Sequence, residues 1–223
     1  MRDTSQKTYL IGLAKFFTPF ILGLGGIGCI GYLMDESLRP SYWSLISAYF
    51  FPPLGKETVI PTGILVFHIH PIVMALSIAF VDVIVALFLV WNYDLAKKIP
   101  LVGKFITKIE SKGATAEEKY GWVKPLRFIG IVLFVMVPFQ GSGGLVGSIV
   151  GRLVGMKPWN TFVAIAIGAI IGTLVIASFS KAFQAFAEIN TTLTILLVIV
   201  IVVIIVLYYG YKKVKSKASS TQN

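Results

Sequence analysis

The sequence predicts an all-α integral membrane protein with about four transmembrane helices and two re-entrant helical hairpins of opposite orientation, arranged as an inverted repeat. Hydrophobic residues make up 56% of the 223 residues and charged residues only 13%, against about 25% charged residues in a typical soluble domain. Four segments are apolar over about the 20 residues that a spanning helix needs. Two further apolar segments are each interrupted near the middle by prolines or glycines.

The four uninterrupted apolar segments are residues 9–34, 71–91, 158–179 and 189–209. The first contains one charge, Lys15, whose long side chain can reach water from inside a helix. We expect this segment to stay in the membrane, because no small-residue cleavage site of a signal peptide follows it before Asp35. Cys29, the only cysteine, lies inside the same segment and is expected to be a small core residue.

The two interrupted segments are residues 41–70 and 127–156. In the first, two apolar pieces flank FPPLGKETVIP, and in the second, FIGIVLFVMVPF is followed by a glycine-rich break and another short arm. Each piece is too short to cross a bilayer alone. Irregular backbone at membrane depth must be covered by protein or face a cavity, so we expect both breaks to meet near the centre. Paired broken helices are typical of inverted-repeat transporters.

The distribution of Lys and Arg predicts the topology. These residues concentrate at the start of the chain, in residues 92–126, after the glycine-rich break and in the tail. Basic loops lie in the cytoplasm, so we expect cytoplasmic N- and C-termini. The chain is predicted as one polytopic domain, residues 1–211, with a cytoplasmic loop at 92–126 and a disordered basic tail at 212–223. The expected location is the plasma membrane of a prokaryotic cell, and the net charge of +10 is assigned to this topology rather than to nucleic-acid binding.

The glycine-rich stretch VPFQGSGGLVGSIVGRLVGMKPW, residues 137–159, is predicted to break and pack helices. Val146 stands where both common phosphate-binding loops need glycine, which excludes those loops. Glycines at positions 143, 147, 151 and 155 would lie on one helix face and allow close approach of a neighbour. The break itself presents backbone, amide and hydroxyl groups beside a helix N-terminus. We expect substrate contacts there from Pro138, Gln140, Gly141, Ser142 and Gly143.

Two carboxylates at membrane depth are the candidate proton carriers. Glu57 lies in the first break beside Lys56, and Asp82 lies in the middle of a predicted span. Intramembrane carboxylates are costly and usually functional. The structural alternatives are an ion pair between Lys56 and Glu57 and a hydrogen bond from Asp82 to a neighbouring helix. The remaining candidate substrate residues are Pro53, Lys56, Pro61 and Arg152.

Arg152 has two interpretations, as a counter-ion in the site or as a side chain that reaches the inner membrane surface. His68 and His70 are expected at the outer end of the first hairpin, and two histidines alone do not define a metal site. No cofactor is therefore predicted.

The two breaks also carry a resemblance to known families. FPPLGKETVIPTG resembles the first re-entrant motif of the DedA/VTT (SNARE-associated) superfamily, with Glu57 on its acidic position and Asp82 on the aspartate of the following helix. The second break is more similar to a sister group, the small multidrug export protein family. The resemblance covers about residues 41–180 and implies paired re-entrant hairpins and membrane transport. Val135 and Gly141 replace the arginines that flank the DedA proline, which favours the small multidrug export family.

The leading functional prediction is a proton-coupled secondary exporter of small molecules. The alternatives are a phospholipid or polyprenyl-phosphate translocase or scramblase of DedA type, and a membrane scaffold that transports nothing. An enzyme is not expected, because the sequence contains neither H-E-x-x-H nor G-x-S-x-G. The expected partners are membrane lipids, protons and an unidentified small-molecule or lipid substrate, with no nucleic acid; homo-oligomerisation is left open.

Overall fold

The computed structural model describes residues 2–51, 54–93, 123–138 and 142–193, together with residue pairs 195–196, 199–200, 203–204 and 207–208. The elements formed by these residues are all α-helices. The chain divides into two compact units, Met1–Ser180 and Lys181–Asn223. The residues of the candidate site all belong to the first unit.

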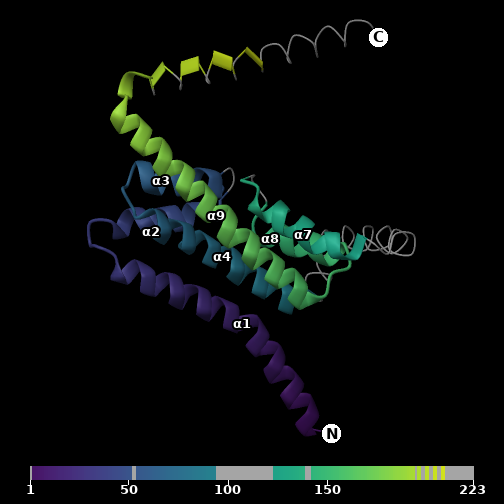
Figure 1. The fold of residues 1–223 in the computed structure, drawn as a ribbon. Helices are drawn as coiled ribbons and strands as arrows, with labels where there is room; N and C mark the ends of the chain where they lie inside the picture. The colour runs from purple at the N-terminus through teal and green to yellow at the C-terminus, as the bar shows by residue number, and fades with distance from the viewer. Residues whose placement is uncertain are drawn as a thin grey trace, which may run out of the picture. The chain divides into compact units, whose positions relative to one another are not determined.

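Three helices are long and apolar enough to cross a membrane: α1 (Arg2–Leu33), α4 (Pro71–Trp91) and α9 (Pro158–Ile189) (Figure 1). At a rise of 1.5 Å per residue, α4 is about 32 Å long, which matches a hydrocarbon core of about 30 Å. Three of the four predicted spans thus correspond to helices that are long and apolar enough to cross a membrane, as in a multi-pass membrane protein. The fourth, 189–209, lies largely outside the described residues.

Two helices extend beyond the predicted segments. α9 continues ten residues past the end of the predicted span at 179, because residues 180–189 contain three alanines, which favour helix, and neither glycine nor proline. α7 begins at Val123, within the last residues of the segment predicted as a loop at about 92–126. The greater part of that loop and the tail at 212–223 lie outside the described residues.

Four shorter helices form two pairs, each with a break at the predicted place. α2 (Arg39–Tyr49) and α3 (Lys56–Leu65) flank the first break, and α7 (Val123–Met136) and α8 (Gly144–Leu153) flank the second. The first helix of each pair ends two or three residues before a proline of the sequence, where the ring hinders helical backbone and removes a hydrogen-bond donor. Each of the four is too short to cross a bilayer alone.

The short helices α3 and α8 lie along successive halves of α4. Near the end of α3, Gly63 packs against Met74 in the first half of α4. The start of α8, at Gly144, contacts Asp82 in the middle of α4, whereas Arg152 in its last turn contacts Tyr93 just beyond α4. α3 therefore runs antiparallel to the first half of α4 and α8 parallel to the second half. Their N-terminal ends meet at the middle of α4.

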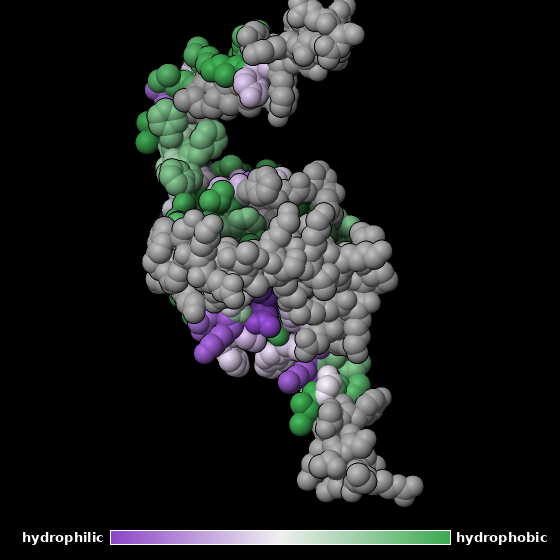
Figure 2. Space-filling view, turned by 90° about the vertical axis from the view of Figure 1, so that its right-hand side faces the viewer, coloured by the Kyte–Doolittle hydropathy of each residue, from purple (hydrophilic) through white to green (hydrophobic). Residues whose placement is uncertain are grey.

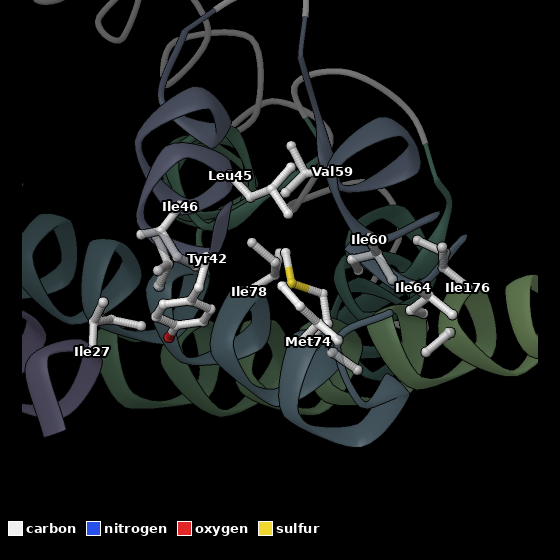
Figure 3. Packing of buried hydrophobic residues seen from close by; sticks show 14 residues of the cluster. Ile27, Tyr42, Leu45, Ile46, Val59, Ile60, Ile64, Met74, Ile78 and Ile176 are labelled. Carbon is white, nitrogen blue, oxygen red and sulfur yellow. The ribbon is translucent and has the colours of Figure 1, made fainter. Parts of the chain in front are cut away.

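The hydrophobic core is divided between the two helix pairs in the same way. One cluster surrounds α2, α3 and the first half of α4, and it includes Tyr42, Ile60, Met74 and Ile176 (Figure 3). The other joins α7, the second half of α4 and the first half of α9, around Val135 and its neighbours. The long helices α4 and α9 contribute to both clusters, so they connect the two pairs.

Glycines set the close packing of α8 and α9, and for Gly147 and Gly151 of α8 this confirms the prediction. A Cβ at Gly168 or Gly172 would lie 2.6 or 2.8 Å from a backbone carbonyl oxygen of α7. In α8, a Cβ at Gly147 would lie 2.7 Å from the side chain of Val135 in α7, and a Cβ at Gly151 would lie 2.5 Å from the side chain of Thr161 in α9. Gly155 does not share this face: its φ of 79° places it in the turn after α8, a conformation that glycine adopts without steric cost.

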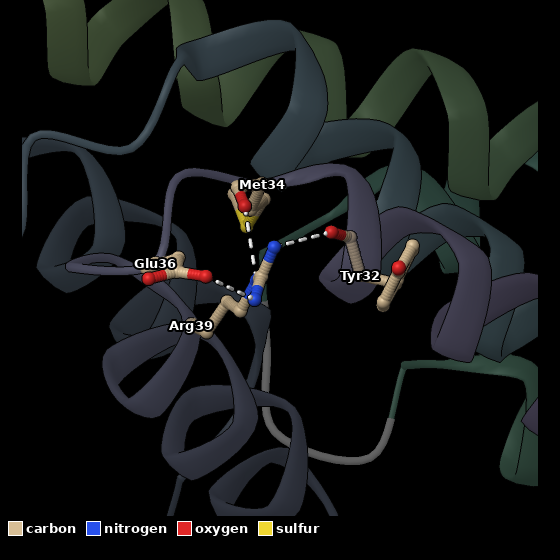
Figure 4. Close-up of polar contacts among 4 residues, drawn as sticks. All are labelled: Tyr32, Met34, Glu36 and Arg39. Atoms are coloured by element: carbon tan, nitrogen blue, oxygen red, sulfur yellow. Dashed lines mark hydrogen bonds and ion pairs between the residues drawn. The ribbon is translucent and has the colours of Figure 1, made fainter.

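α1 packs on α4 and is capped by a residue of α2. A Cβ at Gly26 would lie 2.6 Å from the ring of Phe80, so the two helices approach closely there. At the end of α1, Arg39 donates hydrogen bonds to the carbonyl oxygens of Tyr32 (2.9 Å) and Met34 (3.1 Å) (Figure 4). These carbonyls have no partner within the helix. Cys29 is exposed on α1, so its predicted place in the core was wrong.

Large apolar side chains cover much of the outer surface of the described helices, including Leu24, Ile72 and Phe179. Figure 2 shows exposed hydrophobic residues in green and hydrophilic residues in purple, with most of the purple in one group. Exposed apolar areas of this extent suit contact with lipid rather than water.

Candidate substrate and coupling site

The two helix breaks and the middle of α4 enclose a cavity of about 240 Å³. Its walls come from the end of α2, the start of α3, the middle of α4 and the start of α8. The two breaks therefore meet, as the sequence predicts. The lining residues that carry polar groups are Tyr49, Lys56, Glu57, Asp82 and the backbone of Gly143 and Gly144.

Asp82 lies at the centre of this cavity wall. It is the twelfth of the 21 residues of α4 and only 3% exposed. Its Oδ1 accepts two hydrogen bonds, from the Tyr49 hydroxyl (2.8 Å) and from the backbone N–H of Gly144 (2.8 Å). Its Oδ2 is buried and has no hydrogen-bond partner among the described residues. The predicted alternative, a hydrogen bond from Asp82 to a neighbouring helix, thus accounts for Oδ1 but not for Oδ2.

The start of α8 needs glycine to reach Asp82. A Cβ on Gly144 would overlap the backbone carbonyl of Asp82, and a Cβ on Gly143 would lie 2.6 Å from its Oδ1. The obstacle at Gly144 is backbone and cannot turn away, whereas the obstacle at Gly143 is the carboxylate of Asp82 itself. The second break can therefore place a backbone donor on Asp82 only because Gly144 has no side chain, and a side chain at position 143 would displace the carboxylate.

Lys56 connects the first break to the second helix pair. Its side chain is 2% exposed, and its Nζ donates a hydrogen bond to the carbonyl oxygen of Val135 in α7. Val135 is in the last turn of α7, where carbonyl groups have no partner within the helix. In the described part of the chain no ion pair joins Lys56 to Glu57, so the predicted local pair is not formed.

Glu57 lies in the first turn of α3 and is half-buried. Its carboxylate folds back over Gly55, where a Cβ would overlap it. Its Oε2 is buried and finds no hydrogen-bond partner within the described ranges. A negative charge in the first turn of a helix is stabilised by the helix dipole.

The electrostatic balance of the cavity depends on two helix ends. α3 and α8 both begin at its wall, and each N-terminus acts as about half a positive charge. Together with the ammonium group of Lys56, they oppose the negative charges of Glu57 and Asp82. Two carboxylates at membrane depth would be costly without such compensation.

Several predicted site residues lie elsewhere. Ser142 is buried, but its hydroxyl donates to the carbonyl oxygen of Val137 (2.6 Å) and closes the break rather than lining the cavity. Pro61 lies inside α3 and Pro138 is exposed after α7, and neither lines the cavity. Pro53, Gln140 and Gly141 lie outside the described residues.

Arg152 is not brought to the carboxylates. It lies in the last turn of α8, where its Nη1 donates to the carbonyl oxygen of Met156 (2.7 Å) and its guanidinium lies 4.7 Å from the ring centre of Tyr93. It lines a second cavity, which shares no residue with the first.

Within the described ranges, no three His, Cys, Asp or Glu residues are placed so that they could hold an ion together. His68 and His70 lie in the link between α3 and α4.

Residues 57–175 match the model of the family named Putative small multi-drug export protein, over more than half of the 223 residues. The chain belongs to this family. The family match begins at Glu57, the second residue of α3, and contains Asp82 and the whole of α8, whereas α2 and Lys56 precede it. Neither a curated protein nor a solved structure matches this small multi-drug export family member.

Sequence reasoning missed two contributors to the site, Tyr49 and Gly144. Tyr49 precedes the family match, and its signal was weak: a polar aromatic residue at the end of a short apolar arm. Gly144 was assigned to the same stretch as its neighbour Gly143 but given no role. Its close contact with Asp82 depends on tertiary packing that local sequence does not encode.

Proposed function

We propose that the protein is a proton-coupled secondary exporter of small molecules. Its substrate site is the cavity between the two breaks, and Asp82 and Glu57 carry the coupled protons. The observation that carries this proposal is the geometry of Asp82, where one oxygen is held by donors from both helix pairs and the other has no partner among the described residues. The family's name supports small-molecule export as the class of activity.

The lengths of the half-helices support re-entrant hairpins. α3 and α8 each contain 10 residues and are therefore about 15 Å long, half the thickness of the hydrocarbon core. They cover opposite halves of α4 and begin at its middle, so we place one hairpin in each half of the bilayer. Transporters with inverted repeats bind substrates and coupling ions at the midplane, between discontinuous helices.

The two donors to Asp82 suggest how proton transfer is coupled to movement. Tyr49 belongs to the first helix pair and Gly144 to the second. A movement of either pair withdraws a donor from Asp82. A buried carboxylate that loses its donors favours the protonated form. The hairpin positions and the protonation of Asp82 are therefore linked, and alternating access follows when the two hairpins move in turn.

The proposal is tested in proteoliposomes that contain a pH-sensitive dye, with an imposed pH gradient and a panel of lipophilic small molecules. The wild type is compared with Asp82→Asn and Glu57→Gln. Asparagine keeps an oxygen that can accept from Tyr49 and Gly144 but cannot ionise, so it separates titration from folding. Glu188→Gln is the matched control, because Glu188 is an exposed carboxylate of α9. Substrate-dependent proton movement should occur in the wild type and the control and be absent in Asp82→Asn.

Two outcomes would contradict the proposal. Substrate-driven proton movement that persists in both Asp82→Asn and Glu57→Gln would remove the carboxylates from the mechanism. Absence of substrate-driven movement in the wild type, with translocation of a fluorescent phospholipid in the same vesicles, would favour the DedA-type lipid translocase instead. Neither activity in wild-type vesicles would favour a scaffold.

A further inference from the structure

We propose that the second cavity, around Arg152, binds an anionic phosphate group such as a phospholipid headgroup carries. This cavity measures about 620 Å³ and lies where α4 ends at Trp91 and α9 begins after Lys157. It does not depend on the proposed export function, because none of its lining residues lines the cavity at Asp82.

Two basic side chains line the cavity, Arg152 from α8 and Lys15 from α1. The described lining residues include no acid. Arg152 uses Nη1 for the carbonyl oxygen of Met156, but its Nε is buried and has no hydrogen-bond partner among the described residues. A buried donor on a charged group that stays unpaired is costly. An anion in the cavity would satisfy it.

Contacts on both sides hold the guanidinium of Arg152 and the backbone at Lys15 in place. The guanidinium of Arg152 stacks 4.7 Å from the ring centre of Tyr93, which fixes its plane. The side-chain amide of Asn92 donates to the backbone oxygen of Lys15 (3.1 Å), which ties α1 to the end of α4. A planar guanidinium fork recognises phosphate oxygens by paired hydrogen bonds, and the ammonium group adds a second charge.

The aromatic lining indicates the depth of the cavity. Trp91 and Trp159 both line it, and they stand at the end of α4 and the start of α9. Tryptophan concentrates at membrane interfaces, at the level of lipid headgroups. Basic pockets between transmembrane helices at the cytoplasmic side bind anionic headgroups. The phosphate of a lipid lies at this depth, so a headgroup can enter the cavity without leaving the bilayer.

The test measures binding of phosphatidylglycerol and phosphatidylcholine to the purified full-length protein by native mass spectrometry. The wild type should bind phosphatidylglycerol more tightly than phosphatidylcholine. Arg152→Gln and Lys15→Gln should each weaken phosphatidylglycerol binding by about tenfold, the loss expected for a charge-assisted hydrogen bond. Lys15 is exposed, so its replacement leaves folding intact. Lys157→Gln is the matched control. Lys157 is an exposed lysine just before α9, and it does not line the cavity.

A second arm separates a lipid from a free anion. Fluorescence of Trp91 and Trp159 is recorded in a variant that carries Trp43→Phe and Trp122→Phe, during titration with inorganic phosphate. A phosphate-induced change that Arg152→Gln abolishes shows that the cavity binds the anion itself. No response to phosphate, with phosphatidylglycerol preference retained, assigns the site to the lipid headgroup. Equal losses of phosphatidylglycerol binding in Arg152→Gln and Lys157→Gln would overturn the proposal.

Discussion

The backbone N–H of Gly144 donates a hydrogen bond to the carboxylate of Asp82, with 2.8 Å between the nitrogen and Oδ1. The two residues are 62 positions apart in the chain. The same oxygen accepts the hydroxyl of Tyr49. One atom in the middle of α4 thus holds the ends of two broken helices, so small changes around it should have large effects.

Gly144→Ala should strongly destabilise the protein. Its methyl group would overlap the carbonyl oxygen of Asp82, which forces α8 away from α4 and breaks the hydrogen bond. We expect a loss of about 3 kcal/mol or more, the sum of overpacking and of one bond to a charged group. The measurement is the melting temperature in detergent. Gly130→Ala in α7 is the control, because its Cβ would meet nothing within 4 Å; equal stability of the two variants would refute the prediction.

Tyr49→Phe should lower stability more than Tyr42→Phe. Each change removes one hydroxyl donor and keeps the ring, but Tyr49 donates to the carboxylate of Asp82, whereas Tyr42 donates to the hydroxyl of Ser77 (3.0 Å). Hydrogen bonds to charged groups contribute about 1.5–3 kcal/mol and neutral ones about 1 kcal/mol. Thermal unfolding of both variants shows which change lowers stability more. A larger loss in Tyr42→Phe would indicate that Asp82 is not charged in the folded protein.

Lys56→Met should cost about 3–5 kcal/mol, the loss seen when one member of a buried charge arrangement is removed. The change deletes the donor to Val135 and leaves two carboxylates without their cation. Adding Glu57→Gln should then restore part of the stability, because one uncompensated charge disappears. Chemical denaturation of the single and double variants gives the free energy of interaction between Lys56 and Glu57. Strictly additive effects would show that Lys56 acts on Val135 alone; Lys181→Met, at an exposed site of α9, serves as control.

Arg39→Ala should destabilise the end of α1 by about 1–2 kcal/mol, because two helix-terminal carbonyl groups lose their donors. Glu36→Ala should change stability by at most about 0.5 kcal/mol. Its ion pair with Arg39 spans 3.4 Å, and its side chain is 90% exposed, so water screens the attraction. Melting temperatures of the two variants test this contrast, and similar losses would mean that the ion pair rather than the capping holds Arg39.

The breaks were predictable because their causes are local. Prolines and glycines weaken a helix locally and mark the places where it can end, although Pro61 and Gly63 lie inside α3. A carboxylate in an apolar segment is visible in the sequence alone. Irregular backbone inside a membrane must be covered by protein, so the two breaks were expected to meet. That expectation also brings Glu57 and Asp82 to the same cavity. The direction in which each half-helix runs was less accessible to sequence reasoning.

Arg152 and Cys29 show what the sequence left undecided. Arg152 follows Gly144 by two turns of helix and so lies about 12 Å further along its axis, at the other end of α8 from the carboxylates. Its distance from the site depends on which end of α8 faces Asp82. Cys29 faces outward because apolar sequence does not distinguish a lipid-facing side from a packed one, lipid tails being as apolar as a core.

The contacts of Asp82 also restrict which residues its position can hold. Glutamate is one methylene longer and would carry its oxygens into the start of α8, where the space does not admit even the Cβ of an alanine. Residues without a side-chain oxygen would leave the donors of Tyr49 and Gly144 unpaired. Aspartate and asparagine alone combine the required length with an acceptor. An exchange to any residue other than asparagine is therefore compatible with the fold only if the start of α8 changes with it, so residue 82 and the second break should change together.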